Sequence, residues 1–115
     1  MSVTIYHNPR CSKSRQTLSL LEDNGVTPVI IEYLKTPPSR DELVNILEKL
    51  NLSPRDLMRK GEPEFKENNL SDPALSDQQL IDAMLEHPKL IERPIVTANG
   101  KARIGRPPES VLEIV

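Results

Sequence analysis

Cys11 is the only cysteine in the chain, and the residues around it suit a reactive thiol. No large aliphatic or aromatic side chain stands from Asn8 to Gln16. Side chains that are cationic, or can become so, lie within four positions of Cys11 at His7, Arg10, Lys13 and Arg15. Positive charge favours the thiolate, which is the nucleophilic form of cysteine. The pattern therefore predicts a nucleophile with a lowered pKa rather than the inert core residue that a free cysteine more often is.

The same turn has the composition of an anion-binding site. We expect Cys11 to lie exposed where a strand ends and a helix begins, and the N–H groups and dipole at a helix N-terminus attract anions. Asn8, Ser12 and Ser14 add polar side chains that support such a turn. Turns of this kind bind small tetrahedral oxyanions. The nucleophile and the oxyanion are therefore expected to meet at Cys11.

Two familiar cysteine motifs are absent from this segment. A phosphatase-type loop needs arginine six positions after the cysteine, where this chain has Thr17. A dithiol oxidoreductase needs a second cysteine three positions on, where this chain has Ser14. Because thiol exchange requires an attacking thiolate, an oxidised or substrate-bonded Cys11 has to be discharged by an external thiol.

The N-terminal third predicts a strand, a helix and a second strand. Alternating apolar residues indicate a strand over Ser2–His7. Leucines at helical spacing follow Cys11 up to Asn24 and Gly25, which together form a helix stop. The run Val29–Leu34 is apolar enough for a strand buried on both faces. Such a unit favours parallel strands with a right-handed crossover.

The remaining two thirds predict mostly helices and one hairpin. Capping boxes at Ser39 with Glu42 and at Ser76 with Gln79 each indicate a helix N-terminus. A short helical segment is expected from Pro54 to Met58, followed by an irregular stretch from Lys60 to Asp72. Strands are expected at Ile95–Ala98 and Ala102–Ile104, joined by a three-residue loop that contains Asn99 and Gly100. A last helix is expected to begin at Pro107 and Pro108.

This order of elements predicts an α/β thioredoxin-like fold with a mixed sheet. The plan is βαβ, a helical insert, then ββα, in a single domain over residues 1–115 with the insert at about 37–90. Ligands of α/β proteins bind at the carboxyl ends of the strands. Cys11 is expected at that place.

Composition argues against several classes of function. The length of 115 residues suits one domain, and fifteen Lys and Arg against seventeen Asp and Glu give a net charge of -2, which disfavours nucleic acid as a partner. No apolar run approaches the roughly 18 residues of a membrane span, and the first residues lack the apolar core of a signal peptide. One cysteine and two distant histidines offer neither a disulfide nor a metal site. We expect a cytoplasmic protein.

Several spaced motifs together resemble one known family. They are the run HNPRCSKSR from His7 to Arg15, Arg59, the segment ERPIV from Glu92 to Val96, and GRP from Gly105 to Pro107. In this order, and over essentially the whole chain, they resemble the glutaredoxin-dependent arsenate reductases of the ArsC type. The sequence ends soon after the last expected helix begins and has cations beside Cys11, so it is similar to a shorter chromosomal branch of that family.

The resemblance implies a role for each matching residue. Cys11 would be the thiolate that attacks arsenate, and His7 would help to keep its pKa low. Arg59, Arg93 and Arg106 would hold the oxyanion, and Pro94 would be the cis-proline that faces the catalytic turn. The resemblance also implies glutathione as co-substrate, glutaredoxin as partner and no bound cofactor.

The residues themselves leave alternatives open. Arg55 or Lys60 could be the cation facing the site in place of Arg59, and His7 could make a merely structural hydrogen bond. The chain could also be a monothiol oxidoreductase that removes glutathione from proteins. A regulatory binding module of the same fold, without arsenate turnover, is a further alternative.

Overall fold

A computed structural model describes residues 2–115, and these divide into two compact units. The sheet unit comprises residues 2–36 and 93–115, and the helical unit comprises residues 37–92. The predicted insert, at about 37–90, falls within the residues of this unit, and the single domain over 1–115 stays a prediction. Among residues 2–115, no helix combines the length and the apolar character needed to cross a membrane.

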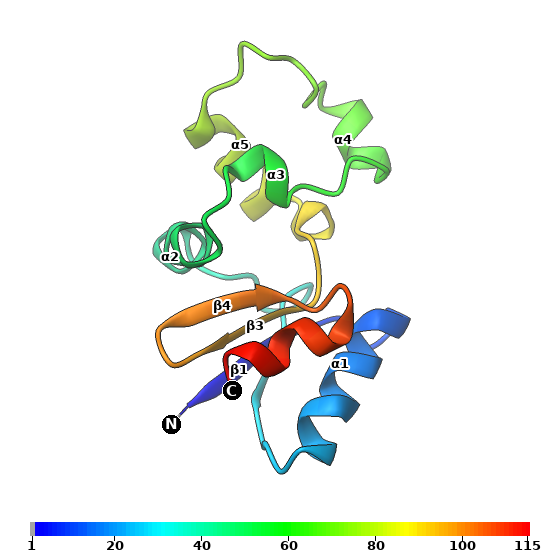
Figure 1. Cartoon of the computed structure of the whole chain (residues 1–115). Coiled ribbons are helices and arrows are strands. Elements are labelled where there is room, and N and C mark those ends of the chain that lie inside the picture. The colour runs from blue at the N-terminus through cyan, green and yellow to red at the C-terminus, as the bar shows by residue number, and fades with distance from the viewer. Residues whose placement is uncertain (1) are drawn as a thin grey trace. The chain divides into compact units, whose positions relative to one another are not determined.

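The sheet unit has a four-stranded mixed sheet, as predicted (Figure 1). Its elements are β1 (Val3–His7), α1 (Ser12–Asp23), β2 (Val29–Glu32), β3 (Ile95–Ala98), β4 (Lys101–Ile104) and the 3-10 helix η2 (Pro108–Glu113). The strand order is β2-β1-β3-β4, with β1 parallel to β2 and antiparallel to β3. The predicted α/β thioredoxin-like fold is confirmed.

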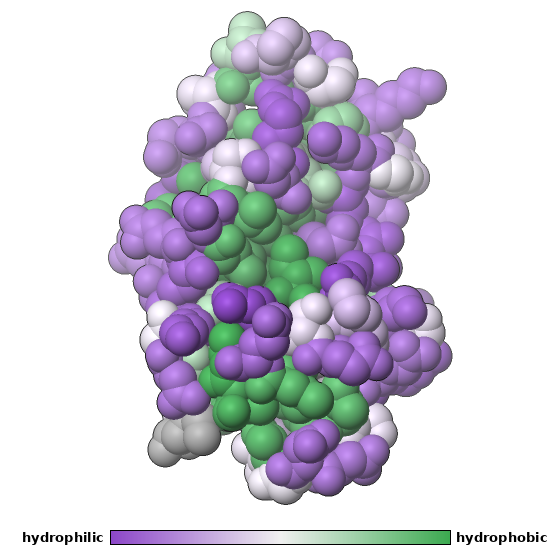
Figure 2. Space-filling model, viewed as in Figure 1, coloured by the Kyte–Doolittle hydropathy of each residue, from purple (hydrophilic) through white to green (hydrophobic). Residues whose placement is uncertain are grey.

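The core of the sheet unit lies under α1 and η2, which contact each other (Figure 1). Val3 and Ile5 of β1 pair with Ala98 and Val96 of β3, so these four side chains share one face of the sheet. The buried cluster on that face is completed by Leu21 of α1 and by Val111 and Ile114 at η2. Figure 2 shows apolar residues in green near α1 and η2, with polar residues over much of the surrounding surface. One sheet face is thus covered by both helices.

The prediction that the second strand is buried on both faces is wrong. Val29 and Ile30 are 56% and 48% exposed, because β2 is the edge strand and pairs only with β1. The strand also ends at Glu32, two residues earlier than predicted, where the N–H groups of Lys35 and Thr36 bond the Glu32 carbonyl in a turn.

The β3–β4 hairpin has a shorter loop than predicted. Lys101 already belongs to β4, so only Asn99 and Gly100 form the loop, and both have positive φ, at 54° and 73°. A two-residue loop that follows the twist of the strands requires this left-handed backbone, which glycine and asparagine tolerate. The Asn99 side chain also donates to the Ile114 carbonyl at 2.8 Å. The hairpin is therefore tied to the end of the chain.

The helical unit contains the two helices whose capping boxes were predicted. Its elements are α2 (Arg40–Leu50), α3 (Pro54–Leu57), α4 (Pro63–Glu67), α5 (Asp77–Glu86) and the 3-10 helix η1 (Pro88–Leu90). Both boxes are present, at Ser39 with Glu42 and at Ser76 with Gln79. The stretch predicted to be irregular contains α4, which begins at Pro63 and buries Phe65, so that prediction is wrong in part.

Candidate active site

Cys11 is the N-cap residue of α1, at the turn that follows β1. Its own N–H donates to the Asn8 carbonyl and its carbonyl accepts from the Arg15 N–H, both at 3.0 Å. These bonds fix the turn from both sides. Only 8% of Cys11 is exposed, so the expectation of an exposed cysteine is wrong. The sulfur nevertheless lies close to hydrogen-bond donors and positively charged side chains of the sheet unit.

The surroundings of the sulfur lower its pKa. Burial alone would raise the pKa of the Cys11 thiol, but the backbone N–H groups of Ser14 and Lys13 and the Arg93 guanidinium outweigh it and bring the pKa below its ordinary value. Backbone donors at a helix N-terminus stabilise the thiolate, and so does a hydrogen-bonded cation. The first turn of α1 thus supplies the donors that the sequence predicted, and Arg93 supplies charge from another segment.

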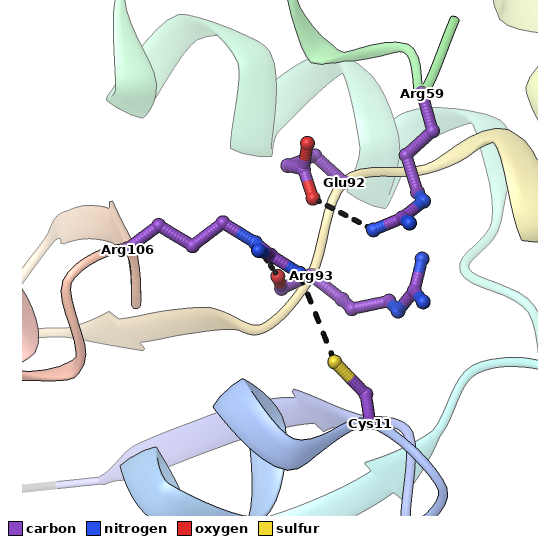
Figure 3. Close-up of polar contacts among 5 residues, drawn as sticks. All are labelled: Cys11, Arg59, Glu92, Arg93 and Arg106. Carbon is purple, nitrogen blue, oxygen red and sulfur yellow. Dashed lines mark hydrogen bonds and ion pairs between the residues drawn. The ribbon is translucent and has the colours of Figure 1, made fainter. Parts of the chain in front are cut away.

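Arg106 also reaches Cys11 (Figure 3). Its Nη2 lies 3.7 Å from the Cys11 Sγ, and its Nε donates to the Arg93 carbonyl oxygen at 2.8 Å. Arg93 precedes β3 and Arg106 follows β4, and each is followed by a cis-proline, Pro94 or Pro107. Two arginines that flank the neighbouring strands β3 and β4 therefore meet at the sulfur.

Gly105 lets the end of β4 approach α1, a feature that the sequence analysis missed. A Cβ atom at this position would lie 2.5 Å from the Thr17 Oγ1 and 2.7 Å from the Pro94 Cγ. The Gly105 N–H donates to the Pro94 carbonyl at 2.9 Å. Only glycine fits here without displacing its neighbours. The close approach positions Arg106, the next residue.

His7 bonds Ser14 rather than Cys11. The His7 Nδ1 lies 2.7 Å from the Ser14 Oγ, which accepts from the Asn8 N–H at 3.0 Å. Burial lowers the pKa of His7, Glu32 acts to raise it and Arg15 to lower it, with a net decrease. A neutral imidazole accepting at Nδ1 fits these contacts. Asn8 and Ser14 thus support the turn together with His7, whereas Ser12 is exposed on α1.

Arg59 belongs to the helical unit, where it pairs with Glu92. The Arg59 Nη1 lies 3.1 Å from the Glu92 Oε1, and the backbone N–H of Arg59 donates to the Leu90 carbonyl at 2.7 Å. The alternative cation Arg55 donates to the carbonyls of Leu70 and Asp72, at 2.7 and 2.9 Å, which is a structural role. Nothing in the sequence predicted Glu92 as the partner of Arg59.

The sheet unit therefore combines a nucleophile with an oxyanion-binding arrangement. A thiolate at Cys11 is flanked by the guanidinium groups of Arg93 and Arg106, whose planar, permanently charged forks match tetrahedral oxyanions. Among residues 2–115, no group of three or more potential metal-ligating side chains is found. The arrangement suits attack by sulfur on a small oxyanion whose developing charge is held by guanidinium groups.

Known proteins share this sequence and fold. A family model described as the ArsC family matches residues 6–114. The Escherichia coli K12 protein described as uncharacterized protein YfgD is 60% identical over 98% of this chain and 96% of its own length. An arsenate reductase of the same strain is 47% identical over 99% of this chain and 81% of its own length. The solved structure of an arsenate reductase from Vibrio cholerae matches with a TM-score of 0.97 and 59% identity, covering 100% of this chain and 98% of that one.

Proposed function

Because the chain belongs to the ArsC family, we propose that it reduces arsenate to arsenite with Cys11 as the nucleophile. The observation that carries this proposal is the Cys11 sulfur, whose pKa is lowered and which has the Arg106 Nη2 at 3.7 Å. A tetrahedral oxyanion bound by Arg93 and Arg106 would meet this thiolate directly. A relative named arsenate reductase, 47% identical over nearly the whole chain, supports arsenate as that oxyanion.

The first step joins sulfur to arsenic without a change of oxidation state. The Cys11 thiolate attacks arsenic, an S–As bond forms, and one arsenate oxygen leaves as water after protonation. Arg93 and Arg106 stabilise the negative charge on the remaining oxygens, and such fixed donors lower the barrier most when they are oriented in advance. We assign Arg59 the same role as a third cation. His7, Asn8 and Ser14 position the turn that carries the nucleophile.

Reduction then needs two external thiols, because Cys11 is the only cysteine. Glutathione forms a bond from its sulfur to the Cys11-bound arsenic, and a second water leaves. The glutaredoxin thiolate next attacks the glutathione sulfur, and the As–S electron pair stays on arsenic, which is thereby reduced by two electrons. Hydrolysis of the Cys11–arsenic bond releases arsenite and restores the thiolate. The cytoplasm keeps glutathione reduced, and we place the reaction there.

The test is a coupled assay of arsenate-dependent NADPH consumption with glutathione, glutaredoxin and glutathione reductase. We expect turnover by the wild-type protein and none above background by Cys11→Ser. Omitting glutaredoxin while keeping glutathione separates the two thiol steps, and turnover should then fall sharply. A wild-type rate equal to that of Cys11→Ser would refute arsenate reduction by this protein.

A further inference from the structure

A pocket of about 170 Å³ opens in the sheet unit beside the turn that carries Cys11. One wall is the loop after β1, from Asn8 to Arg10, and the other is the end of β2 and the turn after it, with Glu32, Leu34 and Lys35. His7 also lines it. We call it the β2 pocket.

The β2 pocket lies on the other side of Cys11 from the two arginines. In the strand order β2-β1-β3-β4, the loop after β1 has β2 on one side and β3 with β4 on the other. Arg93 and Arg106 come from the β3 and β4 side, whereas Glu32 and Lys35 come from the β2 side. An oxyanion held by the arginines therefore leaves the β2 pocket open to a second reactant. The β2 pocket lies close to the nucleophile in the chain, because Arg10, which lines the pocket, directly precedes Cys11.

The charges of the β2 pocket match a ligand that carries both signs. Arg10 and Lys35 offer cations and Glu32 offers a carboxylate. The Lys35 Nζ and Glu32 Oε1 are 3.6 Å apart, with side chains 79% and 42% exposed, and such exposed pairs are weak enough to exchange for a ligand. Leu34, 39% exposed, and Pro9 add apolar surface. An α-amino acid end group, with its carboxylate and ammonium on one carbon, fits this arrangement.

The wall next to Cys11 is fixed before any ligand binds. The Asn8 Oδ1 accepts from the Arg10 N–H at 3.0 Å, and the Arg15 Nη1 donates to the Pro9 carbonyl at 2.9 Å. A site held in place in advance loses less conformational entropy on binding. The volume is below the roughly 300–1,000 Å³ of pockets for drug-sized ligands, so the β2 pocket would hold one end of a short peptide.

We propose that the β2 pocket binds the α-amino acid end of the reducing peptide thiol, and that this placement brings its sulfur to the arsenic on Cys11. The inference rests on the proposed arsenate reduction and adds the site at which its reductant docks. In this step the thiol sulfur bonds to arsenic and its proton leaves with an arsenic hydroxyl as water. No atom is oxidised or reduced until a second thiol attacks.

Lys35→Ala tests the proposal in the glutathione-dependent assay. We expect the KM for glutathione to rise about tenfold, which corresponds to about 1.4 kcal/mol, because the ligand loses its contact with the Lys35 ammonium. With 2-mercaptoethanol, which has no amino acid end, direct measurement of arsenite formation should give equal KM values for wild type and Lys35→Ala. Lys101→Ala removes an exposed lysine of β4 and should leave both values unchanged. The rate of Cys11 alkylation checks that Lys35→Ala has not disturbed the thiol.

A binding measurement separates failure of this inference from failure of the proposed function. S-methylglutathione cannot react, so its titration by NMR needs neither arsenate nor turnover. We expect shifts at the amides of Arg10, Leu34 and Lys35, and weaker binding by Lys35→Ala. Absence of arsenate turnover with these shifts present would overturn the proposed function alone. Turnover with a glutathione KM unchanged in Lys35→Ala, or a titration without these shifts, would overturn the β2 pocket.

Discussion

Arg106 is oriented by the main chain of Arg93: its Nε donates to the Arg93 carbonyl at 2.8 Å while its Nη2 lies 3.7 Å from the Cys11 sulfur. One guanidinium group thus makes both contacts at once, and its fork shape is what allows this. The contact joins Arg106, two residues after β4, to Arg93, two residues before β3, so the geometry of the hairpin sets the position of a cation beside the nucleophile.

Arg106→Lys should therefore lower arsenate turnover although the positive charge is kept. A lysine ammonium is a single compact group and cannot bond the Arg93 carbonyl and face the sulfur in the same way. Loss of one oriented donor typically costs about 10²–10³-fold in rate, and we expect kcat/KM for arsenate to fall about 10²-fold. The measurement is steady-state kinetics with arsenate varied.

Arg103→Ala is the matched control for that substitution. Arg103 is in β4 of the same unit, and its Nε lies 3.5 Å from Glu113. Its loss removes an arginine without touching the contacts at Cys11, so kcat/KM should stay within about twofold of wild type. A loss in Arg103→Ala together with wild-type kcat/KM in Arg106→Lys would mean that general charge, not the oriented guanidinium, governs the rate.

The pH dependence of Cys11 alkylation should reveal the lowered pKa. Alkylation follows the thiolate fraction, which rises as pH increases through the pKa and is constant above it. Because the pKa is lowered, the midpoint should fall below the free-cysteine value of about 8.5. Arg93→Ala removes a hydrogen-bonded cation, so its midpoint should move to higher pH, and alkylation at pH 7 should slow while the plateau stays similar.

Two outcomes would contradict this account. A wild-type midpoint at the free-cysteine value would mean that the donors at the first turn of α1 do not stabilise the thiolate. An unchanged midpoint in Arg93→Ala would mean that the backbone N–H groups of Ser14 and Lys13 act alone. Arg93→Ala also tests the alternative that the protein is a general monothiol oxidoreductase. Such an enzyme needs no oxyanion site, so in that case Arg93→Ala should keep its activity on a mixed disulfide.

Most of the fold could be predicted from patterns of residues that lie close together in the sequence. The turn after β1, the two capping boxes and the Asn99–Gly100 hairpin depend on residues a few positions apart, and the sequence therefore predicted them. The position of β2 at the sheet edge depends on which strands pair, and an apolar run such as Val29–Leu34 does not encode that.

In the candidate site, too, features set by neighbouring residues were predictable, and contacts between distant segments were not. Cys11 and the polar turn were predictable from neighbouring residues, whereas the pairing of Arg59 with Glu92 and the close approach of the Gly105 backbone to Thr17 join distant segments. The positions of the arginines came from resemblance to a family, because composition alone makes each of them an ordinary surface residue. His7 is an example: the sequence places it four residues before Cys11, but its bond to Ser14 depends on how the turn folds.

Gly105→Ala should impair both stability and activity, because this residue lies between α1 and Pro94. The added Cβ would stand 2.5 Å from the Thr17 Oγ1 and 2.7 Å from the Pro94 Cγ, and Thr17 is fully buried with its hydroxyl bonded to the Lys13 carbonyl. Neither neighbour is the free end of a flexible chain, so the backbone must move. Overpacking of this kind costs about 1–3 kcal/mol of the free energy of unfolding.

Gly61→Ala provides the comparison, since its added Cβ would meet no atom within 4 Å. Denaturant unfolding should show a lower midpoint for Gly105→Ala and an almost unchanged one for Gly61→Ala. Displacement of Gly105 also moves Arg106, so kcat/KM for arsenate should fall even at temperatures where Gly105→Ala is fully folded. A folded Gly105→Ala with wild-type kinetics would show that the close approach of β4 to α1 does not set the position of Arg106 beside the sulfur.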